Sequence, residues 1–586
     1  MRRLALLIGV GCGNVEDPST LKADTLDTSS TESSFAGPLH HATDPGPPRF
    51  PEVIDVLTIQ ILTGSGTHDG TDDLMVVCLT EPDDLEEDCF ALDHGNYNDN
   101  EPGDIGVWHF SGLGLPRSEV TEVSLRTAEG ADQWVPMCMD LRFDGEPVYC
   151  EDSLDVKIGD AKGETTAWID PAGLHNACDS CRAEPLTHGP LIGGPEPDRF
   201  RVKVRTDATR QVILRAGTQP DLSDAIDVAY AYPSPRDDFT AVLEATGASP
   251  DETYHYGLVV DGELYAPPWA PVRTAPVPGT PQHTRLAIGS CSKNEDQPIF
   301  ASIGAAEPDL FLLVGDAHYA NSGYLGTLRR YWRWSWERPE RASFLSNVPS
   351  LVVWDDHDFV DNNSYGADFL EWPSYERDNA LKAIQEYTAN PSYGEGVTSG
   401  VFFHYPYGDL DLFFLDGRFY REDPDDVSDP TMLGETQLAW LLEELSASTA
   451  TFKFLVSGST WSLETTNTSD GWVAHEKERA VIFDHIVAES IPGVVLISGD
   501  VHRSEVRLLE VEGGYAIPEI TSSNLAYSGL GSCRSSDDLI TCVDEVHSFV
   551  VVDTDTTLAD PMLTATILGE DSSTRAVWAT TASALR

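Results

Sequence analysis

Five short segments of this 586-residue chain carry side chains that bind metal ions or anions, and each follows a run of apolar residues. The segments are 290–291, 315–319, 355–358, 416–418 and 499–502. Apolar runs of this length bounded by turn residues are typical of buried strands. Ligands bind at the carboxyl ends of such strands in open α/β sheets, so the five segments are expected to converge on one crevice. Their thiolate, phenolate, imidazole and carboxylate groups suit a transition metal beside a harder, oxygen-ligated ion.

Eight of the ten cysteines fall in short-range pairs, which in an exported chain favours disulfides. The pairs are Cys78 and Cys89, Cys138 and Cys150, Cys178 and Cys181, and Cys533 and Cys542. Cys12 and Cys291 are left over. A bound metal would explain an unpaired Cys291, because the ion deprotonates a coordinating thiol. A buried free thiol is the alternative.

Strands and helices must alternate to position these segments. The expected strands are 286–288, 310–314, 351–354, 412–415, 454–456 and 494–497. A helix is expected after Gly434, because leucines at 438, 441, 442 and 445 recur at helical spacing. This alternation predicts a layered α/β domain over residues 284–586.

The first 276 residues have a different pattern. Residues 50–168 and 199–276 alternate apolar and polar residues between turn signals, which predicts two β-sandwiches, the second of immunoglobulin or fibronectin type. Residues 13–48 and 169–198 are rich in turn-forming residues and are expected to be linkers. The predicted fold is therefore multidomain, with two amino-terminal β-sandwiches followed by an α/β domain.

Residues 1–12 resemble a bacterial lipoprotein signal, with two arginines, an apolar run and Gly11 before Cys12. We expect Cys12 to carry lipid and the protein to be exported, either membrane-anchored or periplasmic or extracellular; a plain signal peptide is the alternative. The net charge of −60 argues against a nucleic-acid-binding patch, because phosphate would be repelled.

Residues 286–550 resemble the alkaline phosphatase D (PhoD-like) family of the calcineurin-like metallophosphoesterases. The matching segments are LAIGSC at 286–291, DLFLLVGDAHY at 309–319, VPSLVVWDDHDFVDNN at 348–363, LFFLDGRFYR at 412–421, MLGETQLAWL at 432–441, FKFLVSG at 452–458, GVVLISGDVH at 493–502 and EITSSNL at 519–525. The resemblance implies a four-layer α/β catalytic domain preceded by the family's β-sandwich. It implies an enzyme that hydrolyses phosphate monoesters, diesters or both through a metal-activated hydroxide.

The same resemblance implies individual roles. The implied ligands of a first metal, expected to be Fe³⁺, are Cys291, Asp316, Tyr319 and His502, and those of a second are Asp316, Asp356 and Asp500. Oxygen ligands alone would favour Ca²⁺ at the second position. Asp316 and His357 are the implied catalytic residues, with His357 facing the phosphate.

Several residues keep two interpretations. Asn363 could touch the second metal or cap a turn, and Arg421 could face phosphate or lie on the surface. Asp416 and Arg418 are expected to form a structural ion pair, and His318 to lie behind the ligands or be exposed. Trp332, Trp334 and Trp336 are expected in the core rather than over the pocket.

Residues 50–168 resemble a PLAT (lipoxygenase-homology) domain at Thr63-Gly64, 70–73 and 98–103. The resemblance implies a membrane or protein partner, with Asp69, Asp72 and Asp99 as either calcium ligands or solvated turn residues. The alternative function is therefore a surface-attached lipid- or protein-binding protein that uses this domain and a non-catalytic phosphatase scaffold.

Overall fold

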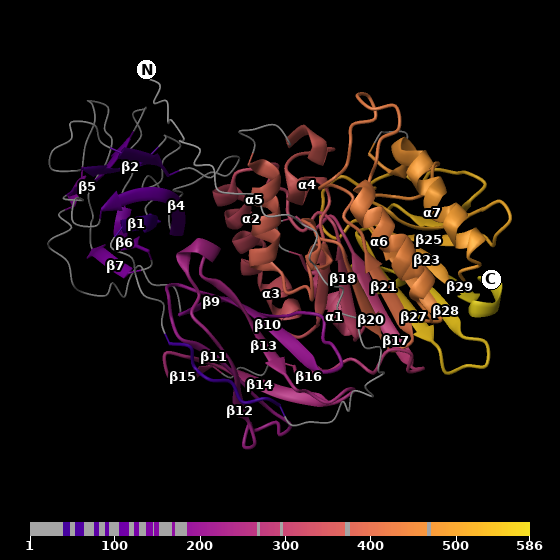
Figure 1. Ribbon diagram of the computed structural model, residues 1–586, viewed down its shortest axis with the longest axis horizontal. Coiled ribbons are helices and arrows are strands. Elements are labelled where there is room, and N and C mark those ends of the chain that lie inside the picture. Colours follow the sequence, from indigo (N-terminus) through magenta and orange to yellow (C-terminus); the bar gives the residue numbers. More distant parts are fainter. Residues whose placement is uncertain are drawn as a thin grey trace, which may run out of the picture.

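The computed structural model describes nearly all of the chain from residue 185 onward and shorter segments before it (Figure 1). The described residues are 39–46, 53–63, 75–80, 88–92, 105–116, 122–127, 136–144, 146–151, 167–169, 185–265, 270–293, 297–369, 375–465 and 470–586. The predictions made for Cys12, Asp69, Asp72, Asp99, Cys178 and Cys181 lie outside these residues.

Two four-stranded sheets share one apolar core in the indigo part of Figure 1. The first sheet has the order β4 (Ile105–Pro116), β1 (Val53–Thr63), β6 (Pro136–Phe143), β7 (Glu146–Glu151), and the second the order β3 (Asp88–Ala91), β2 (Met75–Thr80), β5 (Glu122–Thr127), β8 (Ala167–Ile169). Alternate residues of β1, namely Leu57, Ile59 and Ile61, are buried against Met75 and Val77 of β2. The PLAT-like identity of this unit, and with it the membrane or protein partner, stays a prediction.

The cysteine pairs can be followed where the chain is described. Cys78 is disulfide-bonded and lies opposite Cys89 in the register of β2 and β3. Cys138 and Cys150 lie on β6 and β7, which are hydrogen-bonded neighbours. The predicted disulfide between Cys533 and Cys542 is confirmed, and Cys291 is a buried free thiol.

A second β unit follows. One of its sheets has the order β13 (Thr240–Thr246), β10 (Arg199–Thr206), β9 (Leu186–Ile192), and the other the order β12 (Ile226–Ala231), β11 (Val212–Gly217), β14 (Thr253–Val260), β15 (Glu263–Tyr265), with β16 (Val272–Arg273) also on β14. Strand β9 lies inside the stretch 169–198 predicted as a linker. The glycines and prolines around β9 interrupt the apolar–polar alternation that would predict a strand. Hydrogen bonding to β10 makes this segment a strand.

Part of the other predicted linker, 13–48, also lies against this unit. The His40 amide donates to the Thr246 carbonyl at 2.9 Å, and the Ala42 amide donates to the Asp227 carbonyl at 3.0 Å. Residues 39–46 therefore run along the second β unit instead of standing away from it.

The carboxyl-terminal part, from residue 283 onward, contains two larger sheets. The six-stranded sheet has the order β19 (Ser350–Val353), β18 (Leu310–Val314), β17 (His283–Gly289), β27 (Ser548–Asp555), β28 (Met562–Gly569), β29 (Thr574–Thr581). The seven-stranded sheet has the order β20 (Phe403–Tyr407), β21 (Leu410–Phe414), β22 (Phe452–Val456), β23 (Val494–Ser498), β25 (Ile517–Thr521), β24 (Ser504–Leu509), β26 (Leu539–Val543). All six strands predicted in this part are confirmed, and β17–β19 and β21–β23 are parallel sets.

The parallel strands β21–β23 of the seven-stranded sheet present apolar residues to both faces, as parallel strands covered on both sides should. Phe414, Val456 and Ile497 belong to the same core as the six-stranded sheet. The intervening residues Phe413, Leu455 and Leu496 pack with helices α6 (Gly434–Ala447) and α7 (Glu476–Ala488), which lie together in Figure 1. Helix α6 is the one predicted after Gly434.

Four further helices pack into the core of the six-stranded sheet: α1 (Ile299–Ala305), α2 (Leu325–Glu337), α3 (Pro339–Leu345) and α5 (Glu376–Tyr387). Trp332 and Trp336 of α2 are buried there, which confirms the core interpretation for both, whereas Trp334 is only partly buried. Among the described residues, no helix combines the length and apolarity needed to cross a bilayer.

A buried ionic cluster joins α2 and α5 to the second β unit. Asp238, which is fully buried, accepts hydrogen bonds from Arg205 at 3.2 and 3.3 Å. It also accepts from Arg333 of α2 and from the hydroxyl of Tyr387 of α5. The β unit is therefore tied to helices α2 and α5 of the carboxyl-terminal part.

Candidate metal centre

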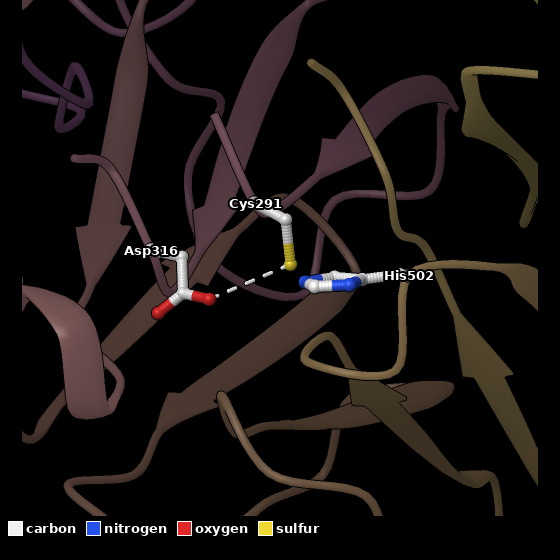
Figure 2. Close-up of side chains that lie close together, drawn as sticks. All are labelled: Cys291, Asp316 and His502. Atoms are coloured by element: carbon white, nitrogen blue, oxygen red, sulfur yellow. Dashed lines mark hydrogen bonds between the residues drawn. The ribbon is translucent and has the colours of Figure 1, made fainter. Parts of the chain in front are cut away.

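Four of the six predicted metal ligands have left-handed backbone just beyond parallel strands. The φ angle is +57° at Cys291 after β17, +55° at Asp316 after β18, and +68° and +55° at Asp500 and His502 after β23. Non-glycine residues adopt this conformation rarely and at an energetic cost, and they gather at functional sites. Figure 2 shows the side chains of Cys291, Asp316 and His502 pointing toward one another from separate loops.

We call Cys291, Asp316 and His502 the first group. Each offers a ligand atom, and these atoms lie within 4.8 Å of one another. The Cys291 Sγ is 3.6 Å from Oδ2 of Asp316. The Tyr319 hydroxyl donates to the same Oδ2 at 3.1 Å and lies 3.5 Å from Nε2 of His502. The four residues predicted around the first metal thus meet in a space that one ion could fill.

Asp316, Asp356 and His357 form a second group on the same distance criterion. Asp356 begins the short helix α4 (Asp356–Phe359), and its carboxylate accepts the His357 amide at 2.9 Å and the Asn363 amide at 2.6 Å. Asn363 therefore contacts Asp356 through its backbone. Asp316 belongs to both groups, as a bridging carboxylate must.

The second group differs from its prediction in one member. Asp500 belongs to neither group within the described part of the chain, whereas His357, which was expected to face the phosphate, belongs to the second. The reason is local, since His357 directly follows Asp356 on the first turn of α4. The structure thus brings an imidazole to a position for which the sequence predicted oxygen ligands alone.

Buried carboxylates crowd around Asp316. Burial, with the neighbouring Asp356 and Asp355, raises the pKa of Asp316 well above its ordinary value. Burial, with Asp470 and Asp355, raises the pKa of Asp500 in the same way. Oδ1 of Asp316 is buried and accepts no hydrogen bond from the described residues. Cations would keep these carboxylates ionised and would satisfy the Asp316 oxygen, so the donor set fits metal binding.

The other donors of the first group also fit a metal. Burial raises the pKa of the Cys291 thiol and of the Tyr319 phenol. Burial lowers the pKa of His502 to about 4, which keeps the imidazole in the neutral form that metals bind. Binding an ion would therefore release protons from the thiol and the phenol.

Arg418 is fully buried behind the second group. Its Nε donates to Oδ1 of Asp355 at 2.5 Å, and its two terminal nitrogens donate to the two carboxylate oxygens of Asp470 at 2.8 and 3.2 Å. Burial by itself would raise the pKa of Asp470, but Arg418 and Arg421 bring it down to about 2. Asp355 immediately precedes Asp356, so Arg418 fixes the start of α4.

The predicted ion pair between Asp416 and Arg418 is therefore wrong. Asp416 instead accepts the backbone amides of Arg418 and Phe419, each at 2.9 Å, and the indole N–H of Trp354 at 2.8 Å. The two side chains are close in sequence, but the turn after β21 folds Asp416 onto its own backbone and directs Arg418 to other loops.

Burial decides the placement of Arg421 and His318. Arg421 is fully buried and donates to the Asp470 carbonyl at 2.7 Å, so its surface placement is wrong. His318 is fully buried with its ring centroid 4.9 Å from that of Trp332, so its exposed placement is wrong too. Phosphate binding by Arg421 stays a prediction.

Three residues beside the groups were not singled out from the sequence. Asn321 Oδ1 lies 2.5 Å from Nδ1 of His357. The Tyr527 ring centroid lies 4.3 Å from that of His502 and 5.0 Å from that of Tyr319. The Ser523 hydroxyl contacts Cys291. Ser523 falls in the segment 519–525 that resembles the phosphatase family, but nothing in that segment indicates which residue its loop will touch.

Residues 286–547 match the family model described as PhoD-like phosphatase. Alkaline phosphatase D of Bacillus subtilis (strain 168) is 27% identical over 389 residues, which cover 56% of this chain and 62% of that relative. A solved structure described as "Structure of PhoD" matches with a TM-score of 0.57 at 19% identity, covering 68% of this chain and 90% of that chain. The stretch that carries the candidate metal centre, residues 286–547, is therefore similar to PhoD-like phosphatases in sequence and in fold.

Proposed function

We propose that this protein is an exported, metal-dependent hydrolase of phosphate esters. The observation that carries the proposal is that two groups of metal-binding side chains share Asp316 at the carboxyl ends of parallel strands. The family of residues 286–547 supports the same chemistry.

The first group and Tyr319 would hold one ion, for which thiolate and phenolate favour Fe³⁺. Asp316, Asp356 and His357 would hold the second ion, and Asp500 remains a proposed ligand of that ion. Ca²⁺ was expected there from oxygen ligands alone, and the added imidazole extends the proposal to transition metals. Such a pair of ions, when bound, clamps phosphate oxygens and lowers the pKa of a coordinated water.

The protein's own groups would orient the ester and stabilise charge. His357 has Nδ1 against the Asn321 side chain, so Nε2 is the ring nitrogen left for a metal or a substrate oxygen. Burial lowers the pKa of His357, although Asp356 opposes this shift. Arg418 and Asp355 hold the turn that presents His357, so its ring is fixed before the ester arrives.

Hydrolysis of p-nitrophenyl phosphate and bis-p-nitrophenyl phosphate tests the proposal and separates monoester from diester preference. Asp316→Asn and His357→Ala should each lower turnover by at least about 100-fold, as expected for the loss of one electrostatic stabiliser. His404→Ala is the matched control, because His404 pairs with Asp411 at the edge strand β20. Wild-type rates in the Asp316 and His357 variants would refute the proposal and favour the binding protein instead.

Metal content gives an independent test of the first group. Cys291→Ser should lower iron measured by plasma emission on purified protein, because a hydroxyl is a poorer ligand than a thiolate for this ion. An unchanged iron content would indicate that Cys291 is a buried free thiol and not a metal ligand.

Export, with Cys12 as the lipid-bearing residue, is part of the proposal. The Cys533–Cys542 disulfide supports it, because such bonds persist outside the reducing cytosol. Cell fractionation of the wild type and Cys12→Ala would test it: the wild type should sediment with membranes and the variant should not. Wild-type protein found only in the cytosolic fraction would contradict it.

A further inference from the structure

The Ser523 hydroxyl bridges two members of the first group that come from different loops. It donates to Sγ of Cys291 at 3.0 Å and accepts the backbone amide of His502 at 3.0 Å. Ser523 itself is fully buried. Cys291 follows β17 and His502 follows β23, so a single side chain sets the spacing between a strand end of each large sheet.

The Ser523 hydroxyl uses both its donor and its acceptor function. A serine hydroxyl has one proton to donate and two lone pairs that accept. Ser523 uses the proton for Cys291 and a lone pair for His502, and both uses can coexist. A buried hydroxyl with both functions engaged is held in one orientation.

The Ser290 hydroxyl, next to Cys291 in sequence, does not play the same role as Ser523. Ser290 Oγ is also close to Cys291 Sγ, at 3.3 Å, and is equally buried. It donates its proton, however, to the Ser522 carbonyl at 3.0 Å. The ionised Asp316 carboxylate and the Asp500 carbonyl, 3.6 and 3.7 Å from Sγ, can only accept. The Tyr319 hydroxyl also lies against Cys291 but donates its proton to Asp316. Among the described hydroxyls beside the sulfur, Ser523 is the one that directs its proton to Cys291.

Hydrogen bonds to neighbouring elements hold the segment that carries Ser523. Ser504 Oγ donates to the Ser523 carbonyl at 2.9 Å. Further along, the Leu525 and Ala526 amides donate to the carbonyls of Ser290 and Cys291 at 3.0 and 3.1 Å. These bonds attach the Ser523 segment both to β24 and to the loop that carries Cys291, so the hydroxyl has a fixed position relative to the sulfur.

We propose that Ser523 is a positioning residue for metal binding: its hydroxyl orients Cys291 and His502 as ligands and tunes the thiolate by a hydrogen bond. The inference rests on the proposed metal binding by the first group. Hydrogen bonds to ligating atoms fix ligand direction and alter metal affinity and electronic properties. Nothing in this role requires Ser523 to touch a phosphate ester.

The test uses the full-length protein stripped of metal and titrated with Co²⁺, whose thiolate charge-transfer absorption reports the Cys291 bond without any turnover. Ser523→Ala should weaken Co²⁺ binding by about 10-fold or more, as loss of a residue behind a ligand does. It should also shift the charge-transfer band. Ser290→Ala is the matched control and should keep the wild-type affinity and band.

The isosteric pair Ser523→Thr and Ser523→Val repeats the comparison at constant shape and covers the case in which Ser523→Ala folds poorly. Threonine keeps the hydroxyl and should bind Co²⁺ more tightly than valine, with the wild-type band. Equal affinity and band position in this pair, or wild-type behaviour of Ser523→Ala, would overturn the inference. A wild type with no thiolate band would overturn it together with Cys291 ligation, whereas ester hydrolysis, assayed separately, decides the proposed function.

Discussion

Replacing Arg418 with methionine removes the positive charge between Asp355 and Asp470 while leaving a long apolar side chain in its place. The Arg418 side chain is 0% exposed, and those of Asp355 and Asp470 are 2% and 5% exposed. Water cannot take over the lost hydrogen bonds at such exposures. Removing one partner of a buried ion pair costs about 3–5 kcal/mol. For a cooperative unit of about 400 residues, this corresponds to a fall of about 4–6 °C in the unfolding midpoint.

The same substitution should reduce activity beyond its effect on stability. Arg418 holds Asp355, the residue before Asp356 and His357, and a displacement of catalytic groups by about 1 Å can cost about 100-fold in rate. The assay is p-nitrophenyl phosphate hydrolysis with metal in excess, at a temperature where calorimetry finds the variant folded.

Arg507 supplies the control for this experiment. It is also 0% exposed and also holds two carboxylates, Glu505 and Asp538, both at 2.7 Å, but on strand β24. Arg507→Met should lower the midpoint by a similar amount and leave the turnover of folded protein near wild type. If Arg418→Met kept both the wild-type midpoint and the wild-type rate, or if both variants lost activity equally, the positioning argument would be refuted.

Two further substitutions test the packing that supports the site. Asp238→Asn leaves Arg205 and Arg333 without their buried counter-charge and should lower the free energy of unfolding in urea by about 3–5 kcal/mol. The control Asp251→Asn, in an exposed ion pair, should lower it by at most about 1 kcal/mol. Equal losses would contradict the buried cluster. Gly458→Ala would place a Cβ 2.6 Å from Cγ of Asp355 and should lower both turnover and the midpoint. Gly304→Ala, in α1 with its nearest atom at 3.6 Å, should be neutral or stabilising by up to about 1 kcal/mol; a reversed order would count against the close packing around Asp355.

The alternation of residues along the chain was enough to predict the strands of the catalytic part. Runs such as 310–314 and 494–497 are apolar throughout because both faces of their sheets are covered. The periodic leucines after Gly434 predicted α6 for an equally local reason. Where the local signal was weak, as in β9 with its glycines and prolines, the strand was missed, because pairing with β10 is a long-range contact.

The sequence by itself determined which donors are present, and in what order: a cysteine, several aspartates, a tyrosine and two histidines, each just beyond a strand. Only the tertiary structure decided which of them share an ion-sized space, and it placed His357 beside Asp316 and Asp356 in the second group. It also gave Arg418 its partners and brought Ser523 to Cys291. The physical reason is that side-chain type is a local property, whereas distances between loops depend on sheet register, left-handed backbone turns and close packing around residues such as Asp355, which no local pattern encodes.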